Sequence, residues 1–214
     1  MSGLWTLPVA YLLGSVPLGY WIPRAMHGID IRTVGSGNTG FTNVYRAVGV
    51  VPGLIVLVAD VAKGALAVLI ARAAGEGAGL IALAGAAAVA GHIWSLFLRF
   101  RGGKGVATAA GVLFSILPIE AALSLAVFGV TVAAGRYISL GSVAAALSFP
   151  IWTLILGSRA PNGVEPPYLA LAVVIAALIT VRHRANIRRL LAGKESRFSL
   201  SRGKGEKEGR RDRG

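Results

Sequence analysis

Apolar runs separated by short polar segments occupy almost the whole chain. Seven such runs stand out: Leu4–Pro23, Val50–Ala74, Gly79–Leu98, Val106–Leu117, Pro118–Ala134, Leu140–Leu156 and Pro167–Val181. Runs near 20 apolar residues have the length of a helix that crosses about 30 Å of hydrocarbon. The pattern therefore predicts an all-α, polytopic integral membrane protein.

The number of spans depends on Pro118, which lies between the fourth and fifth runs. A proline removes a backbone donor and restricts the preceding residue, so two short helices or one kinked helix fit this stretch. With seven spans and the N-terminus outside, all Lys and Arg face the cytoplasm except Arg72, Arg159 and the intramembrane Lys63. Six spans would place Arg136 opposite Arg101. The positive-inside rule thus favours seven spans and a cytoplasmic C-terminus.

The first run is interpreted as a retained span. It has no basic segment before it and no Ala-x-Ala-type cleavage site, which a signal peptide would carry.

Composition agrees with a membrane protein. Hydrophobic residues make up 55% of the chain and charged residues 14%, against about 25% charged residues in a soluble domain. The chain has no cysteine, which excludes thiolate catalysis, iron–sulfur clusters and Cys-based zinc sites. Its His, Asp and Glu residues do not show metal-ligand spacing, so we expect neither a metal nor another cofactor.

The net charge of +13 is concentrated at the C-terminus, where residues 182–214 hold 12 Lys/Arg and 4 Asp/Glu. We predict one transmembrane domain over residues 1–197 and a basic, disordered tail over residues 198–214. A basic tail beside a span is typical of attraction to anionic membrane lipid. No motif for binding nucleic acid accompanies the charge.

Residues 35–46 form the first polar segment with candidate chemistry. They combine three glycines with hydroxyl and amide side chains and end in an arginine. Glycine lets backbone N–H groups approach an anion, and arginine can hold a phosphate through two hydrogen bonds. The alternative is a flexible loop of ordinary turn residues. The candidate ligands here are Ser36, Gly37, Asn38, Thr42, Asn43 and Arg46.

The second polar segment is Arg-Gly-Gly-Lys-Gly at residues 101–105, directly before an apolar run. Backbone N–H groups and the helix dipole favour an anion at such a helix start, and Lys104 adds a full charge. The spacing is not that of a Walker A loop. Basic residues alone would also anchor the span at the membrane surface, but anchoring does not need the glycines around Lys104.

Two histidines lie next to the apolar runs. His92 can bind substrate or make a hydrogen bond inside the bundle, and Phe97 five residues later excludes the His-x4-Asp pair of other acyltransferases. His183 and Asn186 are expected to share one face of a continuing helix. The arginines beside them also suit a stretch that rests on anionic lipid.

Asp60 and Lys63 are ionisable residues inside a predicted span, one helical turn apart. Such residues are candidates for function in a membrane. Opposite charges at this spacing can also neutralise each other as a structural pair.

Taken together, these segments resemble the bacterial acyl-phosphate-dependent glycerol-3-phosphate acyltransferases, the PlsY family. Residues 31–46, Gly91-His92 with residues 97–108, residues 139–142 and residues 183–195 match successive family motifs. The resemblance covers about residues 4–197. It implies seven transmembrane helices in the bacterial plasma (inner) membrane, with the active site on the cytoplasmic side.

The resemblance also implies a reaction: an acyl group passes from acyl phosphate to the sn-1 hydroxyl of glycerol 3-phosphate, the first step of phospholipid synthesis. It places glycerol 3-phosphate against Lys104, His183, Ser36, Arg46 and Asn186. Further substrate-binding candidates are Gly37, Asn38, Thr42, Asn43, Gly102, Gly103, Gly105, Thr108, Ser139, Ser142 and His92. Either His183 or a substrate phosphate oxygen accepts the proton. The expected partners are both substrates, membrane lipid and the soluble enzyme that makes acyl phosphate.

Two other functions compete with this one. A carrier for an organic phosphate would bind near the bilayer midplane, usually between internal repeats, whereas these motifs cluster at one face and no repeat is visible. A non-catalytic scaffold would depend on the basic tail.

Overall fold

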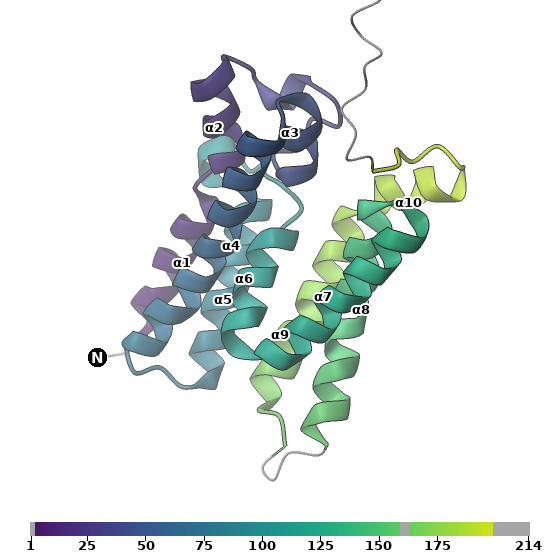
Figure 1. Cartoon of the computed structure of the whole chain (residues 1–214). Helices are drawn as coiled ribbons and strands as arrows, with labels where there is room; N and C mark the ends of the chain where they lie inside the picture. The colour runs from purple at the N-terminus through teal and green to yellow at the C-terminus, as the bar shows by residue number, and fades with distance from the viewer. Residues whose placement is uncertain (1–2, 159–162, 199–214) are drawn as a thin grey trace, which may run out of the picture.

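The apolar runs of the sequence form the helices of the bundle in Figure 1. The structure, a computed structural model, describes residues 3–158 and 163–198, and every regular element within them is helical. Three 3-10 turns span Gly3–Trp5, Ile31–Thr33 and Leu96–Leu98. The α-helices are α1 (Thr6–Ser15), α2 (Leu18–His27), α3 (Phe41–Ala47), α4 (Val50–Ala73), α5 (Ala78–Ile93), α6 (Val106–Ile116), α7 (Pro118–Gly135), α8 (Ile138–Gly157), α9 (Pro166–Arg182) and α10 (Arg184–Leu191).

Four helical segments of the described chain are long and apolar enough to cross a membrane: Val50–Ala73, Ala78–Leu98, Pro118–Gly135 and Ile138–Gly157. The pair α9 and α10 adds a fifth if the two helices count as one span. The α6 helix has 11 residues, a rise of about 16 Å, which is roughly half the hydrocarbon thickness. The all-α, polytopic membrane fold is therefore confirmed, whereas the count of seven spans stays a prediction.

Proline positions explain two interruptions of the apolar runs. Pro17 cannot donate to the preceding turn, and the first run is divided there into α1 and α2. Pro118 occupies the first position of α7, and Leu117 separates α7 from α6. The structure thus has two helices at Pro118, as the seven-span interpretation requires.

The helices form two groups. Helices α1 to α6 lie together, α7 to α9 lie beside them, and α5 and α6 contact α9 across the boundary (Figure 1). Small residues allow close packing: a Cβ atom at Gly91 would overlap the carbonyl oxygen of Tyr11, so α1 and α5 meet backbone to backbone. This is typical of helix contacts in membranes, where small side chains let backbones approach.

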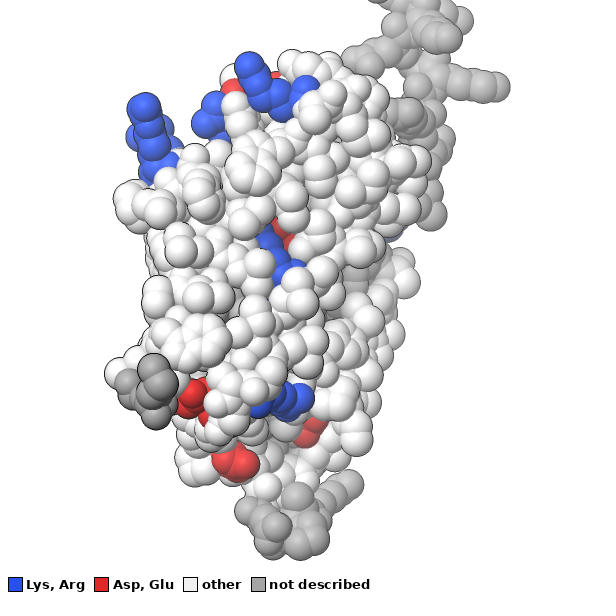
Figure 2. Space-filling model, turned by 90° about the vertical axis from the view of Figure 1, so that its left-hand side faces the viewer, with Lys and Arg blue, Asp and Glu red and all other residues white. Residues whose placement is uncertain are grey.

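The outer surface fits a lipid environment. On the face shown in Figure 2, charged side chains gather toward the two ends and leave a mostly uncharged belt between them. Large apolar side chains such as Val58 of α4 and Val130 of α7 are exposed. The segments with candidate chemistry share one end, where α2, α3, α10 and the turn between α7 and α8 lie (Figure 1).

Candidate active site

Lys104 belongs to a hydrogen-bonded cluster built from distant parts of the sequence, with Glu195 as the partner that its members share. Its Nζ donates to Oδ1 of Asn186 at 2.6 Å, and Nδ2 of Asn186 donates to Oε1 of Glu195 at 2.6 Å. Ser139 Oγ donates to the same carboxylate oxygen at 2.7 Å, and Arg189 Nε donates to Oε2 at 2.7 Å. We call these five residues the Lys104 cluster. It joins the loop before α6, the start of α8, α10 and the segment after α10.

The ammonium group of Lys104 is held in a positive environment. Burial lowers its pKa to about 8; the charge of Glu195 opposes this shift, and Arg189, Arg182 and Arg46 add to it. The hydrogen-bond partner of the ammonium group is a neutral amide, so its charge is not cancelled directly. The site therefore has a surplus of positive charge that favours an anion.

His183 is a neutral, buried imidazole at the junction of α9 and α10. Its Nδ1 lies 2.8 Å from the carbonyl oxygen of Ile179. A carbonyl only accepts, so Nδ1 carries the proton and Nε2 keeps its lone pair. Burial and the charge of Lys104 lower the pKa of His183 to about 4. The imidazole is thus available as a hydrogen-bond acceptor at neutral pH.

The helix that carries His183 bends sharply at this residue. The axes of α9 and α10 differ by 58°, and His183 lies at the bend. The bend follows the end of the apolar run, where α10 becomes rich in arginine. It places Asn186 in contact with Lys104.

The segment 35–46 is shaped largely by its own asparagines. Asn43 Oδ1 accepts the backbone N–H of Ser36 at 3.0 Å, while its Nδ2 donates to the carbonyls of Ile31 at 3.2 Å and Val34 at 3.0 Å. Asn38 Oδ1 accepts the N–H of Gly40 at 2.9 Å. The amide of Asn43 is therefore bonded at both ends within the loop, and the side-chain oxygen of Asn38 is bonded there too. Ligand contact stays a prediction for Ser36, Gly37, Asn38, Thr42 and Asn43.

Arg46 links this loop to the end of the chain. It lies on α3, a helix that the apolar pattern did not predict, and its Nη2 donates to the carbonyl of Ser196 at 3.2 Å. We call residues 193–198 the C-terminal strap. Through Glu195 and Ser196 the strap brings Arg46 into the electrostatic range of Lys104.

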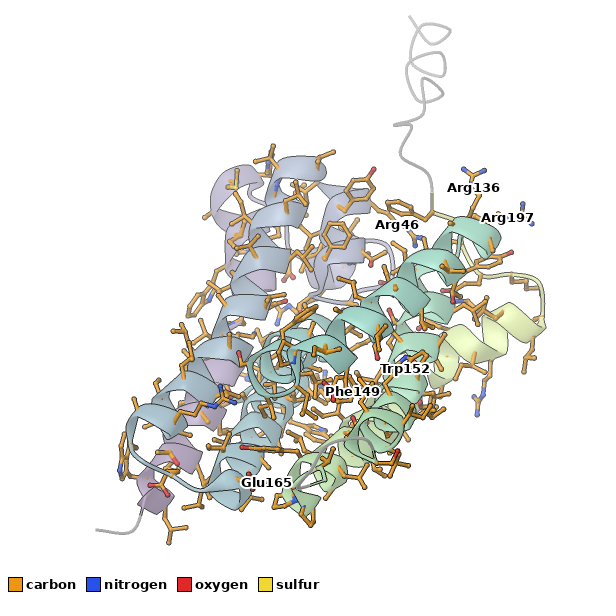
Figure 3. All side chains as sticks on the ribbon, turned by 60° about the horizontal axis from the view of Figure 1, so that its bottom comes forward. Arg46, Arg136, Phe149, Trp152, Glu165 and Arg197 are labelled. Carbon is orange, nitrogen blue, oxygen red and sulfur yellow. The ribbon has the colours of Figure 1, made fainter. Side chains whose placement is uncertain are left out.

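The last described residue of the strap, Phe198, contacts the helical bundle. The N–H of Phe198 donates to the carbonyl of Arg136 at 2.5 Å, and its ring centroid lies 5.4 Å from that of Tyr45. Figure 3 shows Arg46, Arg136 and Arg197 at the same end of the bundle and Glu165 at the opposite end. Residues 199–214 of the predicted tail lie outside the described residues.

Two of the glycines before α6 have their N–H groups bonded within the protein. The N–H of Gly102 donates to the carbonyl of Ile93, and that of Gly103 to the carbonyl of His92, both at 3.1 Å. Gly105 has φ of +83° and precedes the first turn of α6. An anion at this loop would thus meet the ammonium group of Lys104 and the start of α6, but not the N–H groups of Gly102 and Gly103.

The remaining candidates lie around the Lys104 cluster or behind it. Ser142 Oγ donates to the carbonyl of Ile138 at 2.9 Å within α8, and Thr108 is buried in the first turn of α6. His92 is buried near Asp60 and does not join the Lys104 cluster. In the described ranges, His, Asp and Glu form no group with the arrangement of metal ligands.

Sequence reasoning missed Glu195 and Arg182 as parts of the site. Hydrogen bonds from Asn186, Ser139 and Arg189 overcome the effect of burial and hold the pKa of Glu195 below its ordinary value, so it is a carboxylate at neutral pH. Arg182 Nη2 donates to the carbonyl of Gly103 at 3.1 Å. Glu195 is the lone acidic residue of the strongly basic segment 182–197, and that contrast was the signal available in the sequence.

Known proteins resemble this chain over nearly its whole length. A family model described as glycerol-3-phosphate acyltransferase matches residues 4–193. This chain belongs to the glycerol-3-phosphate acyltransferase family. A glycerol-3-phosphate acyltransferase of Desulforudis audaxviator is 49% identical over 192 residues, which cover 90% of this chain and 93% of the relative. One of Trichlorobacter lovleyi is 46% identical over 197 residues, covering 92% and 98%.

Solved structures of this acyltransferase family give the same assignment. The crystal structure of PlsY, an integral membrane glycerol 3-phosphate acyltransferase, in its glycerol 3-phosphate form has a TM-score of 0.86 and 41% identity to this chain. The lysophosphatidic acid form has a TM-score of 0.84 and 40% identity. Each match covers 93% of this chain and 96% of the other. The resemblance to the PlsY family is therefore confirmed.

Proposed function

We propose that this protein transfers a fatty acyl group from acyl phosphate to the sn-1 hydroxyl of glycerol 3-phosphate. The products are 1-acyl-glycerol 3-phosphate and phosphate, and the reaction is the first step of phospholipid synthesis. The Lys104 cluster carries this proposal, because a buried ammonium group with a neutral partner and arginines around it is suited to phosphate. Both substrates and both products carry a phosphate.

We propose that the protein crosses the bacterial plasma membrane seven times, with its N-terminus outside and the site on the cytoplasmic side. In this arrangement α1 with α2 forms one span, α6 and α7 form two, and α9 forms the last. The distribution of Lys and Arg supports it, since Arg24, Arg46, Arg101 and Arg136 then share the cytoplasmic side.

The proposed position of glycerol 3-phosphate follows from the available donors. Lys104 and Arg46 hold its phosphate, with Ser36, Asn186 and His183 around the glycerol. Glu195 accepts from Asn186 Nδ2 and so directs Oδ1 of that amide toward Lys104. A phosphate bound at Lys104 accepts hydrogen bonds from the ammonium group, which in this structure donates to Asn186 Oδ1. Ser139, at the start of α8, donates to Glu195 and so belongs to the same cluster.

The chemistry needs little covalent help from the protein. The sn-1 hydroxyl oxygen attacks the acyl carbonyl carbon, the bond from that carbon to the phosphate oxygen breaks, and inorganic phosphate leaves. Acyl phosphate is already activated, so positioning of the two substrates and stabilisation of the leaving phosphate by Lys104 supply most of the catalysis.

The hydroxyl proton goes to a substrate phosphate oxygen in this proposal. Burial and the charge of Lys104 lower the pKa of His183 to about 4, so the imidazole is a weak base at neutral pH. Nε2 of His183, with its free lone pair, accepts a hydrogen bond from the attacking hydroxyl and orients it.

The test is a reconstituted assay with the purified full chain in lipid. Palmitoyl phosphate and glycerol 3-phosphate are supplied, lysophosphatidate and phosphate are measured together, and palmitoyl-CoA serves as the competing donor. Equal amounts of both products from acyl phosphate alone support the proposal. Turnover with palmitoyl-CoA alone would show that acyl phosphate is not the donor. If a folded protein forms no product from either donor, the proposed acyl transfer is wrong.

A further inference from the structure

A second group of charged side chains lies inside the bundle, away from the Lys104 cluster. Asp60 and Lys63 of α4 and His92 of α5 are all buried, and we call them the Asp60 cluster. Lys63 Nζ lies 2.8 Å from Oδ1 of Asp60, and Nδ1 of His92 lies 3.5 Å from the same oxygen. Intramembrane charges of this kind need partners, because an unpaired charge in a low-dielectric interior is strongly unfavourable.

Lys63 has a structural explanation. The break between α1 and α2 at Pro17 frees carbonyl groups that a continuous helix would have used. Lys63 Nζ donates to the carbonyl of Val16 at 3.1 Å, and Ser95 Oγ donates to that of Ser15 at 2.5 Å. Neighbouring side chains thus satisfy the broken helix, as a membrane interior requires.

His92 connects Asp60 to the loop that carries Lys104. Its carbonyl accepts the N–H of Gly103 at 3.1 Å, so the backbone of the loop rests on the end of α5. Its ring lies against the same residue, because a Cβ atom at Gly103 would overlap Nε2 of His92. A Cβ atom at Gly102 would overlap the carbonyl oxygen of His92. These contacts explain why residues 102 and 103 are glycines: a larger side chain would overlap His92. Anchoring in the membrane does not require glycine, and the N–H groups of both residues are already bonded within the protein.

The Asp60 cluster is too enclosed to bind a substrate of its own. The cavity that Asp60, Lys63 and His92 line together with Ser15, Thr39 and Gly102 has a volume of about 10 Å³, whereas ligand pockets measure about 300–1,000 Å³. The cluster therefore acts through the contact of His92 with the loop.

We propose that His92, held by Asp60, is a positioning residue: its ring and carbonyl set the path of residues 102–103 and thereby place Lys104. The inference rests on the proposed acyl transfer, since its effect is read in that reaction. It accounts for His92 without direct contact between its side chain and substrate.

The experiment is a double-mutant cycle with His92→Asn and Gly103→Ala in the full chain. Asparagine keeps an amide donor near the position of Nδ1, and so a partner for Asp60, but ends before the position of Nε2. In the presence of His92, Gly103→Ala should push the loop away and lower kcat/KM for glycerol 3-phosphate roughly 10- to 100-fold, the effect of a displacement of about 1 Å. In the His92→Asn background the same change should cost no more than about twofold, because the overlap is gone. If the losses in kcat/KM caused by the two substitutions multiply in the double variant, His92 and Gly103 act independently, and the proposal is overturned.

Two further measurements separate positioning from folding. The melting temperature of each variant shows whether it folds, and KM for acyl phosphate, measured apart from KM for glycerol 3-phosphate, should stay within about twofold of wild type. The pair Asp60→Leu/Lys63→Met removes both charges and the oxygen that faces His92. It should fold yet show the glycerol 3-phosphate defect, and full activity would overturn the role of Asp60. Glu120→Gln, at the start of α7, is the matched control and should leave the kinetics unchanged.

The outcomes distinguish this inference from the proposed function. If the wild-type protein makes no lysophosphatidate, the acyl transfer itself is wrong. If the wild type is active and the cycle shows independent losses, the reaction stands and the positioning role is wrong.

Discussion

The Asp60 and Lys104 clusters each contain a buried lysine, and they differ in what faces it. The ammonium group of Lys63 is 2.8 Å from a carboxylate, whereas that of Lys104 is 2.6 Å from the amide oxygen of Asn186. Direct pairing with Asp60 neutralises Lys63 and suits it to a structural role inside the membrane. In the Lys104 cluster the carboxylate of Glu195 accepts from Asn186, Ser139 and Arg189 instead, so the charge of Lys104 remains available to an anion.

Breaking the pair in the Asp60 cluster should have the largest effect on stability. Asp60→Asn leaves Lys63 charged and buried, which we expect to lower the free energy of unfolding by about 3–5 kcal/mol. Unfolding by heat or denaturant in detergent measures this loss. Asp60→Asn/Lys63→Met should recover most of it, and equal instability of the single and double variants would contradict the pairing.

Removing the charge of Lys104 should instead affect turnover. Lys104→Ala takes away the main cation of the proposed phosphate site, so kcat should fall about 10²- to 10³-fold, as for loss of a donor to a transition-state oxyanion. The melting temperature should change little, because the group left behind is a neutral amide. Normal activity in a folded Lys104→Ala protein would remove Lys104 from the mechanism.

Glu195→Gln tests whether the carboxylate orients the cluster. The variant keeps the size of the side chain but weakens the charge-assisted hydrogen bonds from Asn186 and Arg189, so kcat/KM for glycerol 3-phosphate should fall about tenfold. Loss of the negative charge should also lower the pKa of Lys104 further. An alkaline limb of the pH profile that stays at the wild-type position would contradict the electrostatic part of this prediction.

A rise in pH should also weaken the site, because it removes the charge of Lys104. The pKa of Lys104 is lowered to about 8, so the charged form dominates below that pH and is lost as pH rises through it. The value of kcat/KM for glycerol 3-phosphate reports the free enzyme; it should be halved near pH 8 and fall about tenfold by pH 9. Lys104→Arg, which stays charged, provides the control. If the wild-type value of kcat/KM stays constant up to pH 10, the pKa of Lys104 is not lowered.

The sequence by itself determined the class of fold and the protein family. Apolar runs place helices because a lipid interior requires every backbone group to be bonded within its own segment, and the helix interruption at Pro118 follows from the missing donor of proline. The motifs around Ser36, Lys104 and His183 are sufficient to identify the family from the sequence. These are local properties, so they can be read along the chain.

Only the tertiary structure decided which of these polar groups are bonded within the protein and to which partners. Asn43 and Gly103 resemble ligand residues in sequence, yet Asn43 organises its own loop and the N–H of Gly103 is bonded to His92. Glu195 lies far from Lys104 in sequence and reaches its cluster through Asn186 and the 58° bend at His183. A polar group bonds to whatever partner the packed helices bring near it, and that choice depends on contacts between residues far apart in the chain.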